Sequence, residues 1–210
     1  MIRILIADDH PIVRAGLKQI LSDADDIEVA TEAGDGHEFL KQVRKDGCDV
    51  VLLDLAMPGL TGLDALKQIK AEKPGLPILV LSVHPEQEYG IRVLKAGAAG
   101  YLMKSAAPDQ LVEAIRKVFR GGRYVSPALA EKMAFGLQTG ASGLPHETLS
   151  DREHQVLCMI ASGKTVKEIA SELSLSEKTI STYRTRILEK MNMKSNAELT
   201  HYGIKYNLAD

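Results

Sequence analysis

Short apolar runs alternate with amphipathic stretches along the first 120 residues of the chain. The runs are rich in Val, Ile and Leu, and the stretches between them repeat apolar residues at helical spacing. Near-continuous apolar strands are typical of a parallel sheet that helices cover on both faces, so the pattern predicts five βα units. The expected strands are Ile2 to Ala7, Ile27 to Thr31, Val50 to Asp54, Ile78 to Ser82 and Gly100 to Met103.

This pattern breaks at Gly121 and Gly122, which close the last helical stretch. Ser126 and Pro127 have the residue types of a helix start, and the segment that leads to Pro145 carries Gly, Ser and Thr with little to bury. We therefore predict a linker that contains one short helix. The expected division is a first domain of residues 1–122, a linker of residues 123–146 and a second domain of residues 147–210.

Helical periodicity returns in the second domain and predicts a smaller, all-α unit of four helices. The first helix begins after Ser150, which forms a capping box with Glu153, and it stops at Gly163. The other helices are expected at Val166 to Leu173, Glu177 to Met191 and Asn196 to Tyr206. Winding the third helix at about 100° per residue places its apolar residues on one side, where they can pack on the core. These residues are Ile180, Ile187, Leu188 and Met191.

Polar residues end four of the predicted strands. Asp8 and Asp9 follow the first strand, Asp54 ends the third, Ser82 the fourth, and Lys104 follows the fifth. The carboxyl ends of parallel strands meet at one crevice, where three carboxylates repel one another unless a cation lies between them. Mg²⁺ takes a few oxygen ligands and leaves room for a phosphoryl group. Lys104 and Ser82 then offer a positive charge and a hydroxyl donor to the oxygens of a phosphorylated Asp54.

The segments IADDH, LLDLAMPGLTG, LVLSVH and GYLMKS lie at these strand ends and resemble the receiver domains of response regulators. The likeness covers nearly all of residues 1 to 122 and implies a flavodoxin-like, doubly wound fold of five βα units. The likeness also implies a switch pair, in which a hydroxyl moves to the phosphoryl group and an aromatic ring turns inward. The implied roles are Asp54 as phosphoacceptor, Asp9, Asp54 and the carbonyl of Ala56 as direct Mg²⁺ ligands, Asp8 as a water-mediated ligand, Lys104 as phosphoryl contact, and Ser82 with Tyr101 as switch pair.

Two other chemistries are weighed against this site. A phosphotransferase of the haloacid dehalogenase type also uses a strand-end Asp, but it needs a second acid two residues later, where this chain has Ala56. A nucleotide-binding Rossmann domain needs a glycine-rich loop after the first strand, where this chain has Asp-Asp-His. Val83 is bulkier than the small residue usual in receivers, and Ala56 replaces a frequently polar residue, so the rates of phosphorylation and dephosphorylation are open.

Composition and charge add three expectations. No apolar run approaches the roughly 20 residues of a membrane span, and no basic-then-apolar signal opens the chain, so a cytoplasmic protein without membrane contact is expected. Cys48 and Cys158 lie in different halves without further clustering, which favours two core residues over a disulfide or zinc site. The formal net charge is −2, but residues 176–194 hold five basic side chains and two acidic ones.

That basic segment falls on the third helix of the second domain. The sequence from Leu149 to Leu199 resembles the output domain of NarL/FixJ (LuxR-type) regulators, a likeness that covers about residues 147 to 208. It implies a helix-turn-helix whose recognition helix is Glu177 to Met191. Tyr183 replaces a common His, and its role stays open. The expected contacts with double-stranded DNA are Lys164, Thr165, Lys178, Ser181, Thr182, Thr185, Arg186 and Lys190.

Together these features predict a phosphorylation-controlled DNA-binding transcription regulator, not a conventional enzyme, with Mg²⁺ as its cofactor. Its expected partners are a sensor histidine kinase, promoter DNA with repeated half-sites and, when active, a second copy of the chain. The last helix is a candidate interface between copies, although packing within the domain is an equal alternative for its residues Leu199, Tyr202, Gly203 and Tyr206. The alternative function is a phosphorylation-independent DNA-binding regulator whose receiver is a protein-interaction module.

Overall fold

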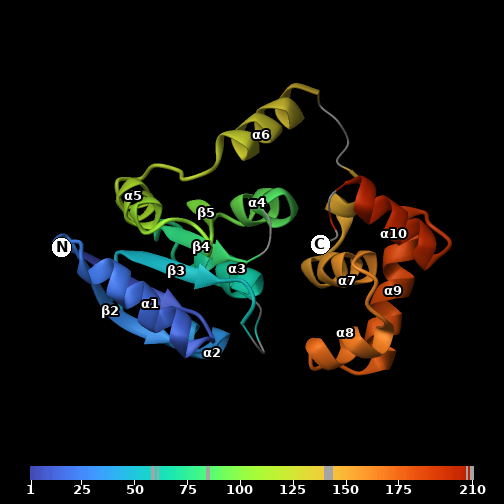
Figure 1. Ribbon diagram of the computed structural model, residues 1–210, viewed down its shortest axis with the longest axis horizontal. Coiled ribbons are helices and arrows are strands. Elements are labelled where there is room, and N and C mark those ends of the chain that lie inside the picture. The colour runs from blue at the N-terminus through green and yellow to red at the C-terminus, as the bar shows by residue number, and fades with distance from the viewer. Residues whose placement is uncertain (58–59, 61, 84–85, 140–143, 207, 209–210) are drawn as a thin grey trace. The chain divides into compact units, whose positions relative to one another are not determined.

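A five-stranded parallel sheet, in the order β2-β1-β3-β4-β5, runs through the first of two units, Met1–Ala134 (Figure 1). The computed structural model describes residues 1–57, 60, 62–83, 86–139, 144–206 and 208. The strands are β1 (Ile2–Ala7), β2 (Ile27–Ala33), β3 (Val50–Asp54), β4 (Ile78–Ser82) and β5 (Gly100–Met103). All residues of β3 and β4 are buried, which confirms the predicted coverage of both faces. The doubly wound α/β fold is therefore confirmed.

One predicted strand is too short. The sequence pattern ends the second strand at Thr31, whereas β2 continues to Ala33 because Glu32 pairs with Ile6 and Ala33 with Ala7. β2 is an edge strand with a single neighbour, so a polar residue such as Glu32 can keep its side chain partly in water while its backbone pairs. The length of an apolar run alone therefore underestimates the length of an edge strand.

Helices cover the two faces of this sheet and create two cores. Phe39, Leu66 and Val93 belong to a core that α2, α3 and α4 form with one face. Leu21 and Ile115 belong to the other, which α1 and α5 form. The helices are α1 (Pro11–Ser22), α2 (Gly36–Val43), α3 (Gly62–Glu72), α4 (Glu86–Lys95) and α5 (Pro108–Phe119). Each strand end is thus held between two packed layers.

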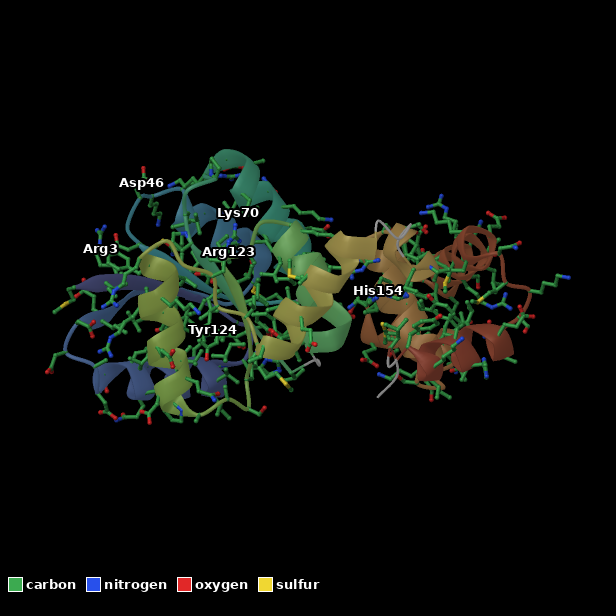
Figure 2. The ribbon with its side chains drawn as sticks, turned by 90° about the horizontal axis from the view of Figure 1, so that it is seen from above. Arg3, Asp46, Lys70, Arg123, Tyr124 and His154 are labelled. Carbon is green, nitrogen blue, oxygen red and sulfur yellow. The ribbon has the colours of Figure 1, made fainter. Side chains whose placement is uncertain are left out.

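After α5, the chain returns to the outer edge of β5. Tyr124, labelled in Figure 2, pairs in parallel with Gly100, and its backbone forms hydrogen bonds of 3.0 Å with the backbones of Ala99 and Tyr101. A Cβ at Gly100 would lie 2.5 Å from the carbonyl oxygen of Tyr124, so a larger residue would prevent this close approach. The predicted linker helix is α6 (Pro127–Thr139), which crosses the division between the two units, and residues 140–143 of the linker lie outside the described residues.

The second unit, Phe135–Asp210, contains the predicted all-α domain. Its elements are the 3-10 helix η1 (Pro145–Thr148), α7 (Asp151–Ala161), α8 (Val166–Glu172), α9 (Glu177–Met191) and α10 (Asn196–Lys205). Ser150 and Glu153 form both hydrogen bonds of the predicted capping box, and Thr165 with Glu168 forms a second one before α8. Ile180, Ile187 and Met191 of α9 are buried and Leu188 packs against the same core, as the helical winding predicts. Among the described residues, no helix is long and apolar enough to cross a bilayer.

Candidate functional site

Asp8, Asp9 and Asp54 come together at the carboxyl ends of β1 and β3. These strands are neighbours in the sheet, and Ala7 pairs with Leu53 immediately before the acidic residues. Ligand atoms of the three carboxylates and of His10 all lie within 4.8 Å of one another. Asp8 and Asp54 are each 1% exposed, so their charges are almost entirely removed from water.

Lys104 supplies a cation within this group. Its Nζ lies 2.6 Å from Oδ2 of Asp8 and 2.8 Å from Oδ2 of Asp54. Its backbone N–H donates to the carbonyl of Ser82 at 2.8 Å, which fixes the loop after β5 against the end of β4. Burial lowers the pKa of Lys104, but its hydrogen bonds to Asp54 and Asp8 raise it more, and the net pKa lies above the ordinary value. Lys104 is therefore a charged ammonium held between two buried carboxylates.

The donor set of this group fits a hard divalent cation. Three carboxylates face one ammonium, so an excess of negative charge remains. Carboxylate oxygens are the ligands that Mg²⁺ prefers, and the backbone of Ala56 adjoins them, since its N–H donates to Oδ1 of Asp54 at 3.2 Å. A Cβ at Gly62 would lie 2.2 Å from the carbonyl oxygen of Asp54, so glycine lets α3 begin close behind the site.

The predicted switch residues lie on the two strands beside this group. Ser82 ends β4 and is fully buried. Tyr101 lies on β5, pairs with Val80, and its side chain is buried in the core that contains α4. Its aromatic ring therefore lies inside the fold and not at the surface.

Two residues around this site, His10 and Arg14, were not predicted from the sequence. The Nδ1 of His10 lies 2.8 Å from Oδ1 of Asp9, and the backbone N–H of His10 donates to Oδ1 of Asp8 at 2.8 Å. The position of His10 directly after Asp8 and Asp9 could have indicated that it contacts them. Arg14 donates to the backbone carbonyl of Asp8 at 2.7 Å. Nothing in the sequence around Arg14, four residues after His10 on the predicted helix, indicated this contact.

In the second unit, the side of α9 that lies opposite its buried apolar residues is exposed. This holds for all six residues of that side, Lys178, Ser181, Thr182, Thr185, Arg186 and Glu189. The hydroxyl of Thr182 donates to the carbonyl of Lys178 at 2.9 Å, and that of Thr185 to the carbonyl of Ser181 at 3.1 Å. These hydroxyls keep acceptor capacity for a ligand, while their protons are directed to the helix backbone.

Three other predicted contact residues have partners inside the domain. Lys164 forms an ion pair with Glu172 at 2.6 Å, and Thr165 is the N-cap of α8. Lys190 forms an ion pair at 2.6 Å with Glu153, a residue of the first capping box. These three predicted DNA contacts therefore already have partners within the output domain.

The two alternatives for α10 are resolved in part. Leu199, Tyr202 and Gly203 are buried in the domain core, and Tyr206 packs against it. A Cβ at Gly203 would lie 2.3 Å from Cβ of Ala161, which shows how closely α10 approaches α7. The apolar stripe that was a candidate interface therefore packs within the domain.

Comparisons with known proteins agree with both halves of this description. Residues 4–116 match the family described as response regulator receiver domain, and residues 147–203 match bacterial regulatory proteins of the luxR family. The response regulator UvrY of Escherichia coli K12 is 42% identical over all of this chain and 97% of its own length. The chain is a LuxR-type response regulator. Its receiver and helix-turn-helix output domain make it a DNA-binding transcription regulator of a two-component system and not a conventional enzyme.

Solved structures of similar regulators cover both domains. RcsB from Salmonella enterica serovar Typhimurium, bound to promoter rprA in the presence of phosphomimetic BeF3−, is 31% identical with a TM-score of 0.66, and the match covers 96% of this regulator and 98% of RcsB. A structure of two RcsB dimers bound to two parallel DNAs is 29% identical with a TM-score of 0.59, and the match covers 96% of each chain.

Proposed function

We propose that phosphorylation of Asp54 controls DNA binding by this regulator. The observation that carries the proposal is the buried carboxylate of Asp54 at a strand end, with the ammonium of Lys104 at 2.8 Å and two further carboxylates beside it. We also propose the division into a receiver of residues 1–122, a linker of 123–146 and an output domain of 147–210, which the matched ranges 4–116 and 147–203 support.

In the proposed reaction, an oxygen of Asp54 attacks the phosphorus of a phosphohistidine on a sensor kinase, or of a small phosphodonor. The new P–O bond forms as the bond between phosphorus and the donor breaks, which is a P–N bond in phosphohistidine and a P–O bond in acetyl phosphate, and the leaving imidazole or acetate keeps the electron pair of that bond. Asp9, Asp54 and the carbonyl of Ala56 would hold Mg²⁺ directly, with Asp8 through water, and the ion would neutralise charge on the phosphoryl oxygens. Lys104 then moves its hydrogen bond from Asp54 to a phosphoryl oxygen, and the hydroxyl of Ser82 donates to another.

Labelling with acetyl phosphate and Mg²⁺ tests the acceptor. Wild-type protein should gain one acid-stable, base-labile phosphoryl group by mass measurement, and Asp54→Asn should gain none. The exposed Asp23 at the end of α1 provides a matched control, because Asp23→Asn removes the same charge away from the site and should label normally. Full labelling of Asp54→Asn would exclude Asp54 as the acceptor.

A second experiment tests the clamp. Lys104→Met should leave Asp54 reactive but break the link between phosphorylation and DNA binding, because the phosphoryl group loses its charged partner. Promoter affinity measured with and without beryllofluoride should then differ less in the variant than in the wild type. An equal response of the two proteins would show that Lys104 is not the clamp.

For the output domain, we propose that the exposed side of α9 lies in the major groove and that two copies bind repeated half-sites. Ser181, Thr182 and Thr185 would contact bases, while Lys178 and Arg186 would contact phosphates. The structure of RcsB dimers on DNA supports this assembly. We propose the cytoplasm as the location of the protein, because the DNA target lies there. Since the apolar stripe of α10 is internal, the interface would use another part of that helix, where Ile204 is 63% exposed.

Selection of bound sequences from random DNA, with and without beryllofluoride, tests the control of DNA binding. Phosphorylation control predicts enrichment of a shared, repeated half-site only when the phosphoryl mimic is present. Equal enrichment in both conditions would favour the alternative, a regulator that binds DNA independently of phosphorylation and uses the receiver as a protein-interaction module.

A further inference from the structure

Arg14 links the acidic site to the edge strand behind it. From the first turn of α1, its Nη1 donates to the backbone carbonyl of Asp8 at 2.7 Å, and its Nε donates to Oε2 of Glu32 at 3.1 Å. Its side chain is only 20% exposed. Glu32 also accepts from Nζ of Lys18 at 2.6 Å, so its carboxylate is shared by two cations.

The carbonyl that Arg14 holds belongs to the peptide that joins Asp8 to Asp9. The sheet holds the preceding peptide, because the N–H of Asp8 donates to the carbonyl of Ala33 at 3.1 Å. A peptide unit is planar, so fixing its oxygen fixes the orientation of the bonds that lead to both neighbouring Cα atoms. A change in the orientation of this peptide would alter the backbone dihedral angles on either side of it, which place the Asp8 and Asp9 side chains beside Asp54.

Glu32 in turn fixes the guanidinium. The pKa of Glu32 is lowered by its hydrogen bond to Lys18, against a smaller opposing effect of burial and with a further contribution from Arg14. An ionised carboxylate at the end of β2 therefore holds Nε, while the planar guanidinium directs Nη1 toward Asp8. The fork connects β2, α1 and the loop after β1 in a single geometry.

We propose that Arg14 is a positioning residue for the divalent cation, because it orients the peptide between two of the proposed ligands. This inference rests on the proposed function of the acidic site. The positioning role and a simple charge effect predict opposite changes in cation affinity when Arg14 is replaced. A guanidinium near a cation site repels the cation, so loss of the charge alone would tighten binding. Loss of the orientation weakens binding.

Titration of the full chain with Mn²⁺, followed by the electron paramagnetic resonance signal of the free ion, tests this inference. Arg14→Met should raise the Kd for Mn²⁺ by about tenfold, the lower end of the effect of residues that support metal ligands. Arg14→Lys keeps the charge and one donor and should restore part of the affinity. Lys18→Met removes the other cation on Glu32 without a contact to Asp8, so it should bind Mn²⁺ as the wild type does.

A second variant keeps the test independent of folding. Glu32→Gln leaves Arg14 in place but weakens its anchor, and it should raise the Kd by a smaller factor than Arg14→Met. Circular dichroism at each titration point confirms that the compared chains are equally folded. If Arg14→Met and Glu32→Gln bind Mn²⁺ as tightly as the wild type or more tightly, the positioning role is wrong. Absence of Mn²⁺ binding in the wild type would instead overturn the proposed cation site itself.

Discussion

Replacement of Lys190 by Met should destabilise the output domain more than it weakens DNA binding. The ammonium lies 2.6 Å from Oε2 of Glu153, and the same oxygen accepts the backbone N–H of Ser150 at 2.8 Å. Glu153 is 3% exposed, whereas the side chain of Lys190 is 42% exposed. The substitution therefore leaves a nearly buried carboxylate with only the hydrogen bonds of the capping box.

The magnitude follows from the burial of the two partners. Breaking a fully buried pair costs about 3–5 kcal/mol, but water screens the exposed partner here, so we expect a loss of about 1.5 kcal/mol. For a domain of this size, that loss lowers the Tm of the output-domain transition by about 6–12 °C, measured by calorimetry of the full chain. Burial raises the pKa of Glu153, but the hydrogen bonds from Lys190 and Ser150 lower it more, and the net pKa is below the ordinary 4.5.

This pKa shift predicts how the effect depends on pH. A carboxyl group with a depressed pKa in the folded state contributes stability above its unfolded pKa and loses it as the pH falls through the folded value. The difference between wild type and Lys190→Met should therefore be complete at neutral pH and shrink below pH 4.5, the ordinary pKa of Glu153. A difference that stays constant across this range would show that the ion pair is not its cause.

Lys178→Met is the matched control, because Lys178 is exposed in the first turn of α9. It should leave the Tm unchanged and lower the slope of log affinity against log salt by about 0.9, the value for one lost phosphate contact. Lys190→Met should lower that slope by less, since its ammonium already has a carboxylate partner. A variant of Lys190 with wild-type Tm and a full unit of lost slope would refute this reasoning.

Two further substitutions test packing around the linker and the output core. Gly90→Ala would place a Cβ 2.7 Å from Cδ2 of the buried Leu129, so the first turn of α6 should undock. Its amide hydrogens should then exchange faster with solvent, as measured by hydrogen exchange. Gly16→Ala is the control, because open space surrounds its Cβ and the exchange of α6 should not change. Tyr202→Phe removes a hydrogen bond of 2.8 Å to Nδ1 of His146, so the free energy of unfolding in urea should fall by about 1 kcal/mol. An unchanged midpoint of urea unfolding would show that this hydrogen bond does not stabilise the output domain.

Much of the fold followed from the sequence because periodicity reports burial directly. The alternation of apolar strands and helices was sufficient for the five-stranded parallel sheet, and the capping box at Ser150 was sufficient for the start of α7, whereas the order of the strands comes from the structure. The end of β2 was wrong because edge strands tolerate polar residues. The short helix η1 was missed, since four residues carry too little periodicity to detect.

The acidic site could be anticipated for a different reason. A parallel sheet brings the carboxyl ends of its strands together whatever the side chains are, so strand-end residues far apart in sequence become neighbours. Contacts such as that of Arg14 with the carbonyl of Asp8 depend on the angle at which α1 leaves the sheet, which no local pattern encodes. The partner of Lys190 was also hidden, because helical winding places a side chain on a face but does not show which residue of another helix faces it.

Lys104 and Lys190, two of the lysines that the sequence assigned to anions, differ in what can release them from their present partners. Lys104 is already desolvated between Asp8 and Asp54, and in the proposed mechanism phosphorylation adds negative charge and acceptor oxygens to one of those same partners. Its transfer to the phosphoryl group therefore needs little further desolvation. DNA is an anion and brings no replacement cation for Glu153, so Lys190 would have to leave this buried carboxylate without its ion pair before it could reach a phosphate. The same residue type is thus suited to switching in the receiver and to structural support in the output domain.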